Sequence, residues 1–229
     1  MSVLPPGEAG QPYDRKAAIY DALIGSRWYN RILWGADRDE YAAFAAQALR
    51  SAPAGYHLDA GCGSLVGTAA AYAAAPSLGV HRPSLLVDAS IGMLRRARRR
   101  LGGTARAEAA GVTLLQGDLR TLPLHAGVLH SALFMGMLHL FDDPGARGVL
   151  VRMARALLPD ASLHLTSLVL GRKRGDRYLR LLERAGEVSA PRSPDALIAL
   201  VESAGFRLQE VRQRGSMLFA IARAEPSGG

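Results

Sequence analysis

The sequence predicts an α/β protein with a doubly wound, mostly parallel sheet. Four short apolar runs alternate with segments of helical periodicity, and this alternation is typical of parallel strands joined by crossover helices. Three of the four runs close on an aspartate, and two glycines come soon after the first of them. The chain has 229 residues, which is enough for one large domain with a sizeable core.

The first strand and its turn lie within His57–Leu65. Asp59 closes the apolar approach, Gly61 and Gly63 follow, and an alanine-rich helical pattern covers residues 66–75. Because glycine lacks a Cβ atom, the backbone can turn tightly there and approach a ligand closely. A nucleotide-like ligand at the carboxyl end of a parallel strand is the expected occupant.

The next three strands follow the same plan. Residues 84–88 form an apolar run ending at Asp88, whose carboxylate can accept two hydrogen bonds from a ribose diol. Residues 112–118 close on Asp118, and residues 128–134 are almost wholly apolar.

The remaining elements are predicted from periodicity and turn residues. In chain order they are a helix over 143–158 that ends before Pro159, a fifth strand over 162–170, a helix over 194–204, and a hairpin over 207–212 and 216–223 that turns at Arg214-Gly215. The expected organisation is a flexible tail over 1–12, a helical cap over 13–53, a ligand-binding domain over 54–224 and a frayed end over 225–229.

The chain resembles the class I S-adenosylmethionine (SAM)-dependent methyltransferases, particularly the small-molecule branch with the ubiquinone/menaquinone-type enzymes. The order and spacing of four motifs carry the resemblance: Leu58–Gly63, Val87–Leu94, Gln116–Leu119 and Leu138–Pro144. It covers roughly residues 56–223. It implies a Rossmann-like sheet of seven strands, mostly parallel with an antiparallel last strand, and SAM as the cofactor.

The resemblance also implies a role for each matching position. Asp59, Gly61 and Gly63, with Ala60 and Cys62 between them, would cradle the amino acid end of SAM, and Met135 and Gly136 would lie near the sulfonium. Asp88 would hold the ribose hydroxyls, Ala89 and Met93 would lie beside the adenine, and Asp118 and the backbone N–H of Leu119 would bind its amino group and a ring nitrogen. The family often has a third glycine where this chain has Leu65, so the loop is expected to turn differently there.

Two interpretations stay open for the aromatic residues before the first strand. Tyr20, Tyr29 and Trp34 have helical spacing, which is usual for core packing. Alternatively, an aromatic face attracts a cation such as the sulfonium of SAM, and Tyr20 and Tyr29 are the candidates. Residues 171–192, with residues 13–35, are expected to form a lid over the methyl acceptor; the alternative is that both segments only pack on the sheet.

The chemistry asks little of the protein, because SAM carries an activated methyl group and the enzyme mainly aligns the acceptor. If the acceptor is a hydroxyl, His139 is the candidate general base, although a structural role for this histidine is the alternative. No metal is expected, since the chain lacks a cluster with ligand spacing and has one cysteine, Cys62. Asp143 is interpreted as the N-cap of a helix rather than a metal ligand.

Composition is that of an ordinary cytoplasmic enzyme. The net charge is +8, from 26 arginines and 2 lysines against 20 acids, and the densest arginine cluster, residues 95–106, is interpreted as a solvated helix face rather than a nucleic-acid site. We find no signal peptide and no apolar stretch that could span a bilayer. The single cysteine fits a reducing compartment.

Three functions remain open. The first is a SAM-dependent methyltransferase acting on a quinone-like, lipid-like or secondary-metabolite acceptor, with S-adenosylhomocysteine (SAH) as product. The second is a SAM-binding protein that catalyses another reaction, such as a cyclisation, or only senses SAM. The third is a nicotinamide-dependent oxidoreductase, for which Val66 stands where the third glycine of the fingerprint belongs.

Overall fold

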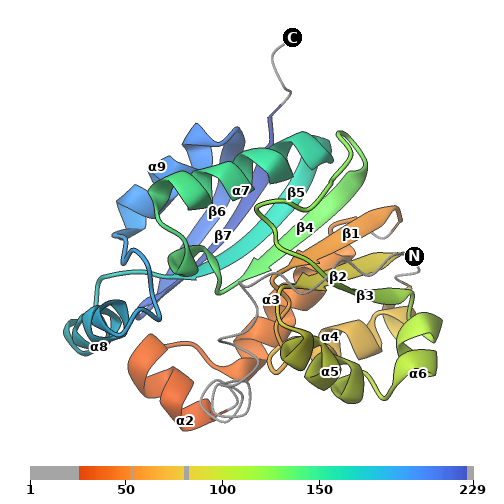
Figure 1. Ribbon diagram of the computed structural model, residues 1–229, viewed down its shortest axis with the longest axis horizontal. Helices are drawn as coiled ribbons and strands as arrows, with labels where there is room; N and C mark the ends of the chain where they lie inside the picture. Colours follow the sequence, from red (N-terminus) through yellow and green to blue (C-terminus); the bar gives the residue numbers. More distant parts are fainter. Residues whose placement is uncertain (1–25, 53, 80–82, 226–229) are drawn as a thin grey trace.

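The computed structural model describes residues 26–52, 54–79 and 83–225 (Figure 1). Their centre is a seven-stranded sheet of order β3-β2-β1-β4-β5-β7-β6. The strands are β1 (Tyr56–Ala60), β2 (Ser84–Asp88), β3 (Val112–Gln116), β4 (Leu129–Met135), β5 (Leu157–Leu168), β6 (Phe206–Arg214) and β7 (Met217–Ala224). Strands β1 to β5 are parallel, and β7 runs antiparallel to β5 and β6. The predicted Rossmann-like sheet, including the closing hairpin, is confirmed.

Helices cover both faces of this sheet (Figure 1). The helical elements are α2 (Arg27–Tyr29), η2 (Asn30–Trp34), α3 (Arg38–Arg50), α4 (Ala69–Ala74), η3 (Pro76–Leu78), α5 (Ile91–Arg100), α6 (Thr104–Ala109), η4 (Leu138–Leu140), α7 (Asp143–Ala156), α8 (Lys173–Arg184) and α9 (Pro194–Ser203). Helices α7 and α9 pack on one face, and α3, α4 and α5 lie on the other. None of the helices in the described ranges is long and apolar enough to cross a membrane.

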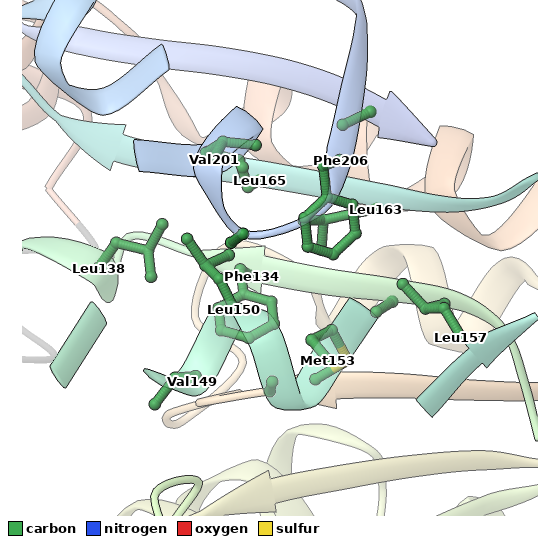
Figure 2. Close-up of a cluster of buried hydrophobic side chains, with 14 of the residues drawn as sticks. Phe134, Leu138, Val149, Leu150, Met153, Leu157, Leu163, Leu165, Val201 and Phe206 are labelled. Atoms are coloured by element: carbon green, nitrogen blue, oxygen red, sulfur yellow. The ribbon is translucent and has the colours of Figure 1, made fainter. Parts of the chain in front are cut away.

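The core beneath α7 and α9 is aliphatic and aromatic (Figure 2). Helix α7 contributes Val149, Leu150 and Met153, whose i, i+1 and i+4 spacing places them on one face. They pack with Phe134 of β4 and Phe206 of β6 in one buried cluster. Residue 133 points the other way, as the two-residue period of a strand requires, and belongs to the second cluster under α3 to α5.

The cap before β1 is interrupted rather than continuously helical. Gly35 ends η2 with a φ of 79°, and Asp37 then starts α3 with a capping box closed by Glu40. Gly35 also touches the β6–β7 turn, because a Cβ there would lie 2.8 Å from the Cα of Gly215. The backbone N–H of Ser216 donates to the Trp34 carbonyl at 3.0 Å. The hairpin therefore fixes the end of η2 against the sheet.

Two predicted boundaries and one cap are wrong by a few residues. Helix α7 ends at Ala156, and β5 begins at once with Leu157, so Pro159 lies inside an irregular strand start. The N-cap of α7 is Asp142, whose carboxylate accepts from the N–H of Gly145, and not Asp143. Asp143 instead accepts a hydrogen bond from Arg192, 49 residues further along the chain, and local sequence does not reveal this contact.

Candidate functional site

Two adjoining cavities lie at the carboxyl ends of the parallel strands. The larger has a volume of about 440 Å³ and the smaller about 270 Å³, and both are lined by Gly61, Gly63, Met135, Gly136 and Leu140. Strand order reverses between β1 and β4, and ligands of open α/β sheets bind at such a switch point. The cavities therefore lie at the edge of the sheet where the sequence analysis expects a ligand.

The smaller cavity contains the predicted adenosine-end residues. Asp88, Ala89, Met93, Asp118 and Leu119 all line it, as the sequence predicted. Asp88 is already engaged in the fold. Its carboxylate accepts from the backbone N–H groups of Gly63 and Ser90, each at 2.8 Å. The side chain therefore fixes the glycine loop while it faces the cavity.

Asp118 has a partner that the sequence analysis missed. Arg120 donates to both of its carboxylate oxygens, at 2.6 to 3.0 Å. The hydrogen bonds from Arg120 hold the pKa of Asp118 below its ordinary value. The spacing of two residues would have suggested a local ion pair, and Arg120 also lines the cavity.

The glycine loop is unusual at Leu65. Gly61 and Gly63 have φ values of 75° and 56°, which glycine adopts without strain, and Leu65 has a φ of 58°. Leu65 takes the left-handed conformation that a third glycine would supply, with its side chain 2% exposed in the core. Next to it, the guanidinium of Arg100 donates to the carbonyl of Ser64 at 2.7 Å.

Asp59 is buried at the meeting point of the loop and the larger cavity. Its side chain is part of the cavity wall but only 1% exposed. Oδ2 accepts from the Tyr72 hydroxyl at 2.7 Å, and Oδ1 has no hydrogen-bond partner among the described residues. Burial raises the pKa of Asp59 from 3.8 to about 7, the Tyr72 hydrogen bond opposes this rise, and the charge of Asp88 adds to it.

The larger cavity has an aromatic and aliphatic wall. Its aromatic members come from the cap and α8: Tyr29, Trp34, Tyr41 and Tyr178. The hydroxyl of Tyr29 donates to that of Tyr178 at 3.0 Å, and the rings of Trp34 and Tyr178 have centroids 5.5 Å apart. The acidic wall residues are Asp59 and Glu187, and no lysine or arginine of the described ranges lines this cavity.

His139 also faces the larger cavity, from η4. It is 7% exposed, and its Nδ1 has no hydrogen-bond partner within the described ranges. Burial, and to a smaller extent the neighbouring charge of Arg192, lower the pKa of His139 from 6.5 to about 4. Arg192 is held by the carbonyls of Leu138 and Phe141, at 3.0 and 2.8 Å. His139 is therefore neutral at physiological pH.

Some predicted site residues lie elsewhere. Ala60 is fully buried in the core and lines neither cavity, because alternate residues of β1 point to the opposite face. Tyr20 falls outside the described residues. Cys62 is buried in the loop and lines the larger cavity, and burial raises the pKa of its thiol. The described ranges contain no group of three metal-ligating side chains.

Comparisons with known proteins agree with this fold. Residues 58–160 match a family model described as a methyltransferase domain. Among solved structures, the mitomycin 7-O-methyltransferase MmcR is 21% identical with a TM-score of 0.67, over 93% of this chain and 60% of that one. The [4+2]-cyclase SpnF is 16% identical with a TM-score of 0.71, and both chains are fully covered.

A possible histamine N-methyltransferase from Thermotoga maritima is 18% identical with a TM-score of 0.63, over 93% of this chain and 98% of that one. This chain spans about three fifths of the length of MmcR. No curated protein sequence matches the chain. At these identities the structural matches establish the Rossmann-like methyltransferase fold, and the ubiquinone-type branch stays a prediction.

Proposed function

We propose that the chain is a class I SAM-dependent methyltransferase that methylates an apolar small molecule. One observation carries the proposal. The glycine loop and the carboxylates of Asp59 and Asp88 meet where two cavities join, one beside Asp88 and Asp118 and one with an aromatic wall. The first suits a nucleoside, and the second suits the reacting groups of donor and acceptor.

The residues present fit the donor. Asp59 keeps a buried oxygen, Oδ1, without a hydrogen-bond partner in the described part of the chain, and such an atom is costly unless a ligand donates to it. The ammonium group of SAM supplies that donor. A Cβ on Gly61 would collide with the sulfur of Met137, so only glycine leaves the loop its present path beside the donor. Asp88 and the apolar side chain of Met93 suit the ribose and the adenine.

The transfer then depends on placement and on exclusion of water. SAM supplies an activated methyl group when it is bound. The aromatic wall of the larger cavity orients the acceptor toward Met135 and Gly136, where the two cavities join. Alignment of this kind accounts for most of the acceleration expected of such a site. The apolar lining keeps water from the reacting pair.

We assign His139 as the group that takes the acceptor proton. It is neutral because burial and Arg192 lower its pKa to about 4, so a ring nitrogen can accept from a hydroxyl at any pH above 5. We expect His139→Gln to lower kcat by about 100-fold or more and to leave the Kd for SAH unchanged. Steady-state rates and calorimetry on the same preparation would measure both, and an unchanged kcat would remove His139 from the mechanism.

The side chains that line the larger cavity favour quinone-like or other aromatic acceptors. Four aromatic rings and the absence of lysine and arginine from the described lining favour an uncharged, planar molecule. MmcR, which resembles this chain in fold, is named for O-methylation of mitomycin. Incubation with methyl-labelled SAM and a panel of naphthols, hydroxyquinones and hydroxylated lipids tests this class. Label transfer to neutral aromatic acceptors is expected, and transfer to none of the panel would contradict it.

Residues 171–192, which the sequence predicts to be part of a lid, contact the N-terminal cap at the larger cavity. Helix α8 belongs to residues 171–192 and packs against η2. Its Tyr178 also accepts a hydrogen bond from Tyr29, the last residue of α2, and both tyrosines line the larger cavity. We expect Tyr178→Phe to raise the acceptor KM about three- to tenfold, since one hydrogen bond holding the two segments is lost, and to leave the SAM KM unchanged. Equal changes in both KM values would argue for general loosening instead. This point variant tests the lid more cleanly than deletion of the segment, which contains the buried Leu179.

A second function has specific support. A histidine whose pKa is about 4 is a weak base, so the same cavity also suits a reaction without proton transfer, such as a cyclisation. SpnF, whose whole length superposes on this chain, is named as a [4+2]-cyclase. Release of SAH in step with product separates the two, because a cyclisation consumes no SAM.

A further inference from the structure

A chain of buried polar side chains runs behind Asp59. Tyr72 of α4 lies between Asp59 and His57 of β1, and His57 in turn contacts Ser131 of β4. The four residues are at most 1% exposed. Buried polar groups are costly unless they are paired, so a chain of four in the core needs an explanation beyond packing.

One assignment of protons satisfies the three bonds of this chain. The Tyr72 hydroxyl donates to Oδ2 of Asp59 at 2.7 Å. Its oxygen then accepts from Nε2–H of His57 at 3.3 Å, which leaves Nδ1 of His57 to accept from the Ser131 hydroxyl at 2.7 Å. Every donor therefore points toward Asp59, the one carboxylate in the chain, and this direction favours its charged form.

We propose that Tyr72 is a positioning residue for the methyl donor: it holds Asp59 ionised and oriented through a buried hydrogen-bond chain that ends at Ser131. This inference rests on the proposed function, because it assumes that the donor ammonium binds Asp59. Tyr72 lines neither cavity, so its route to the donor site is the hydrogen bond to Oδ2 of Asp59. With Oδ2 fixed, the carboxylate cannot rotate freely, and Oδ1 is left for the ammonium.

Donor affinity depends on whether Asp59 is ionised, and the titratable groups around Asp59 affect that ionisation. Asp88, at the end of β2, opposes its ionisation. The Cys62 thiol stays neutral because its pKa is raised, and His139 across the cavity is neutral above pH 5. Glu187 is the other acid on the wall. The pKa of Asp59 is raised to about 7. Asp59 is therefore ionised and able to bind the donor ammonium above pH 7, and donor affinity decreases as the pH falls below 7.

The test is calorimetric titration of the full chain with SAH between pH 5.5 and 8.5. Wild-type protein is expected to bind SAH about tenfold more weakly at pH 6 than at pH 8, as one group with a pKa near 7 requires. Tyr72→Phe removes only the hydroxyl. It should weaken binding about five- to tenfold near pH 7 and approach wild type at the alkaline end.

The ratio of variant to wild-type Kd at each pH cancels any titration of the ligand. A ratio that is constant with pH would show a merely structural role and overturn the proposal, as would a flat wild-type profile. Asp59→Asn should bind weakly with no slope between pH 6 and 8. If Tyr72→Phe does not fold, Ser131→Ala, at the far end of the chain, should shift the profile in the same direction by a smaller amount. If wild type binds no SAH at any pH, the proposed function itself fails.

Discussion

Asp88 has two tasks in this structure. It accepts hydrogen bonds from the glycine loop and from the start of α5, and it lines the nucleoside-sized cavity. A carboxylate can do both because it offers about four acceptor sites. The same side chain therefore couples the shape of the loop to the recognition of a ribose.

We predict that Asp88→Asn weakens SAH binding by about 10- to 100-fold, because hydrogen bonds to a charged acceptor are lost. The measurement is calorimetry beside Arg99→Ala, a control on the exposed face of α5. An equal loss in the control would refute the role of Asp88. Thermal unfolding of both variants should show whether the altered loop also lowers stability.

Sequence alone reaches some of these residues and not others. Asp59, Asp88 and Asp118 could be placed because strand ends have a fixed relation to the sheet edge. Tyr72 and Tyr178 could not, since their partners lie on other elements, 13 and 149 residues away along the chain. Their spacing is that of ordinary helical core residues, and no local signal separates the two cases.

At the scale of elements, the glycine loop and α5 act as one unit. Helix α5 places Met93 in the nucleoside cavity and sends Arg100 back to the carbonyl of Ser64. Leu65 needs such support, because a non-glycine residue at a φ of 58° is strained by about 1 kcal/mol. Its side chain is buried among apolar residues, which offsets that cost.

Arg100→Met keeps an apolar stem and removes the guanidinium. We predict a three- to tenfold rise in the Kd for SAH, as expected for one lost charge-assisted hydrogen bond, with the acceptor KM unchanged. Arg99→Met is the matched control on the same helix and should bind as wild type does. If the two variants have the same Kd for SAH, Arg100 has no role at the donor site and belongs to the solvated helix face that the sequence predicts for the whole arginine cluster.

Element boundaries show where sequence patterns fail. The alanine-rich pattern predicts a helix from residue 66, and α4 begins at Ala69, because the loop continues through residues 64–68 before the chain turns into the helix. Strand β5 begins at Leu157 through a register irregularity, although Pro159 suggested a break. In both places tertiary pairing overrides local preference.

At the scale of the whole molecule, the donor site is maintained at the expense of stability. An acid whose folded pKa is about 7 and whose ordinary value is 3.8 binds more protons in the folded state between those values. Stability from this group is therefore present at low pH and lost as the pH rises toward 7. Bound ligand that pairs with the carboxylate restores it.

Asp59→Asn should therefore stabilise the ligand-free protein at pH 8. We predict a Tm at least about 4 °C above wild type at that pH, with the difference shrinking toward pH 4, where the wild-type acid is protonated. Calorimetric unfolding at both pH values measures it. The same variant should be stabilised less by added SAH than wild type is. A lower Tm than wild type at pH 8 would mean that Asp59 stabilises the fold rather than the complex.

The account depends most on the donor site, so one titration tests it directly: purified wild-type protein with SAM, SAH and NAD in turn. We predict micromolar binding of SAM and SAH at pH 8, no binding of NAD, and binding of SAM and SAH that is about 10- to 100-fold weaker in Asp88→Asn. Binding of NAD alone, or of none of the three, would contradict it, because the strained loop at Leu65 would then not form a donor site.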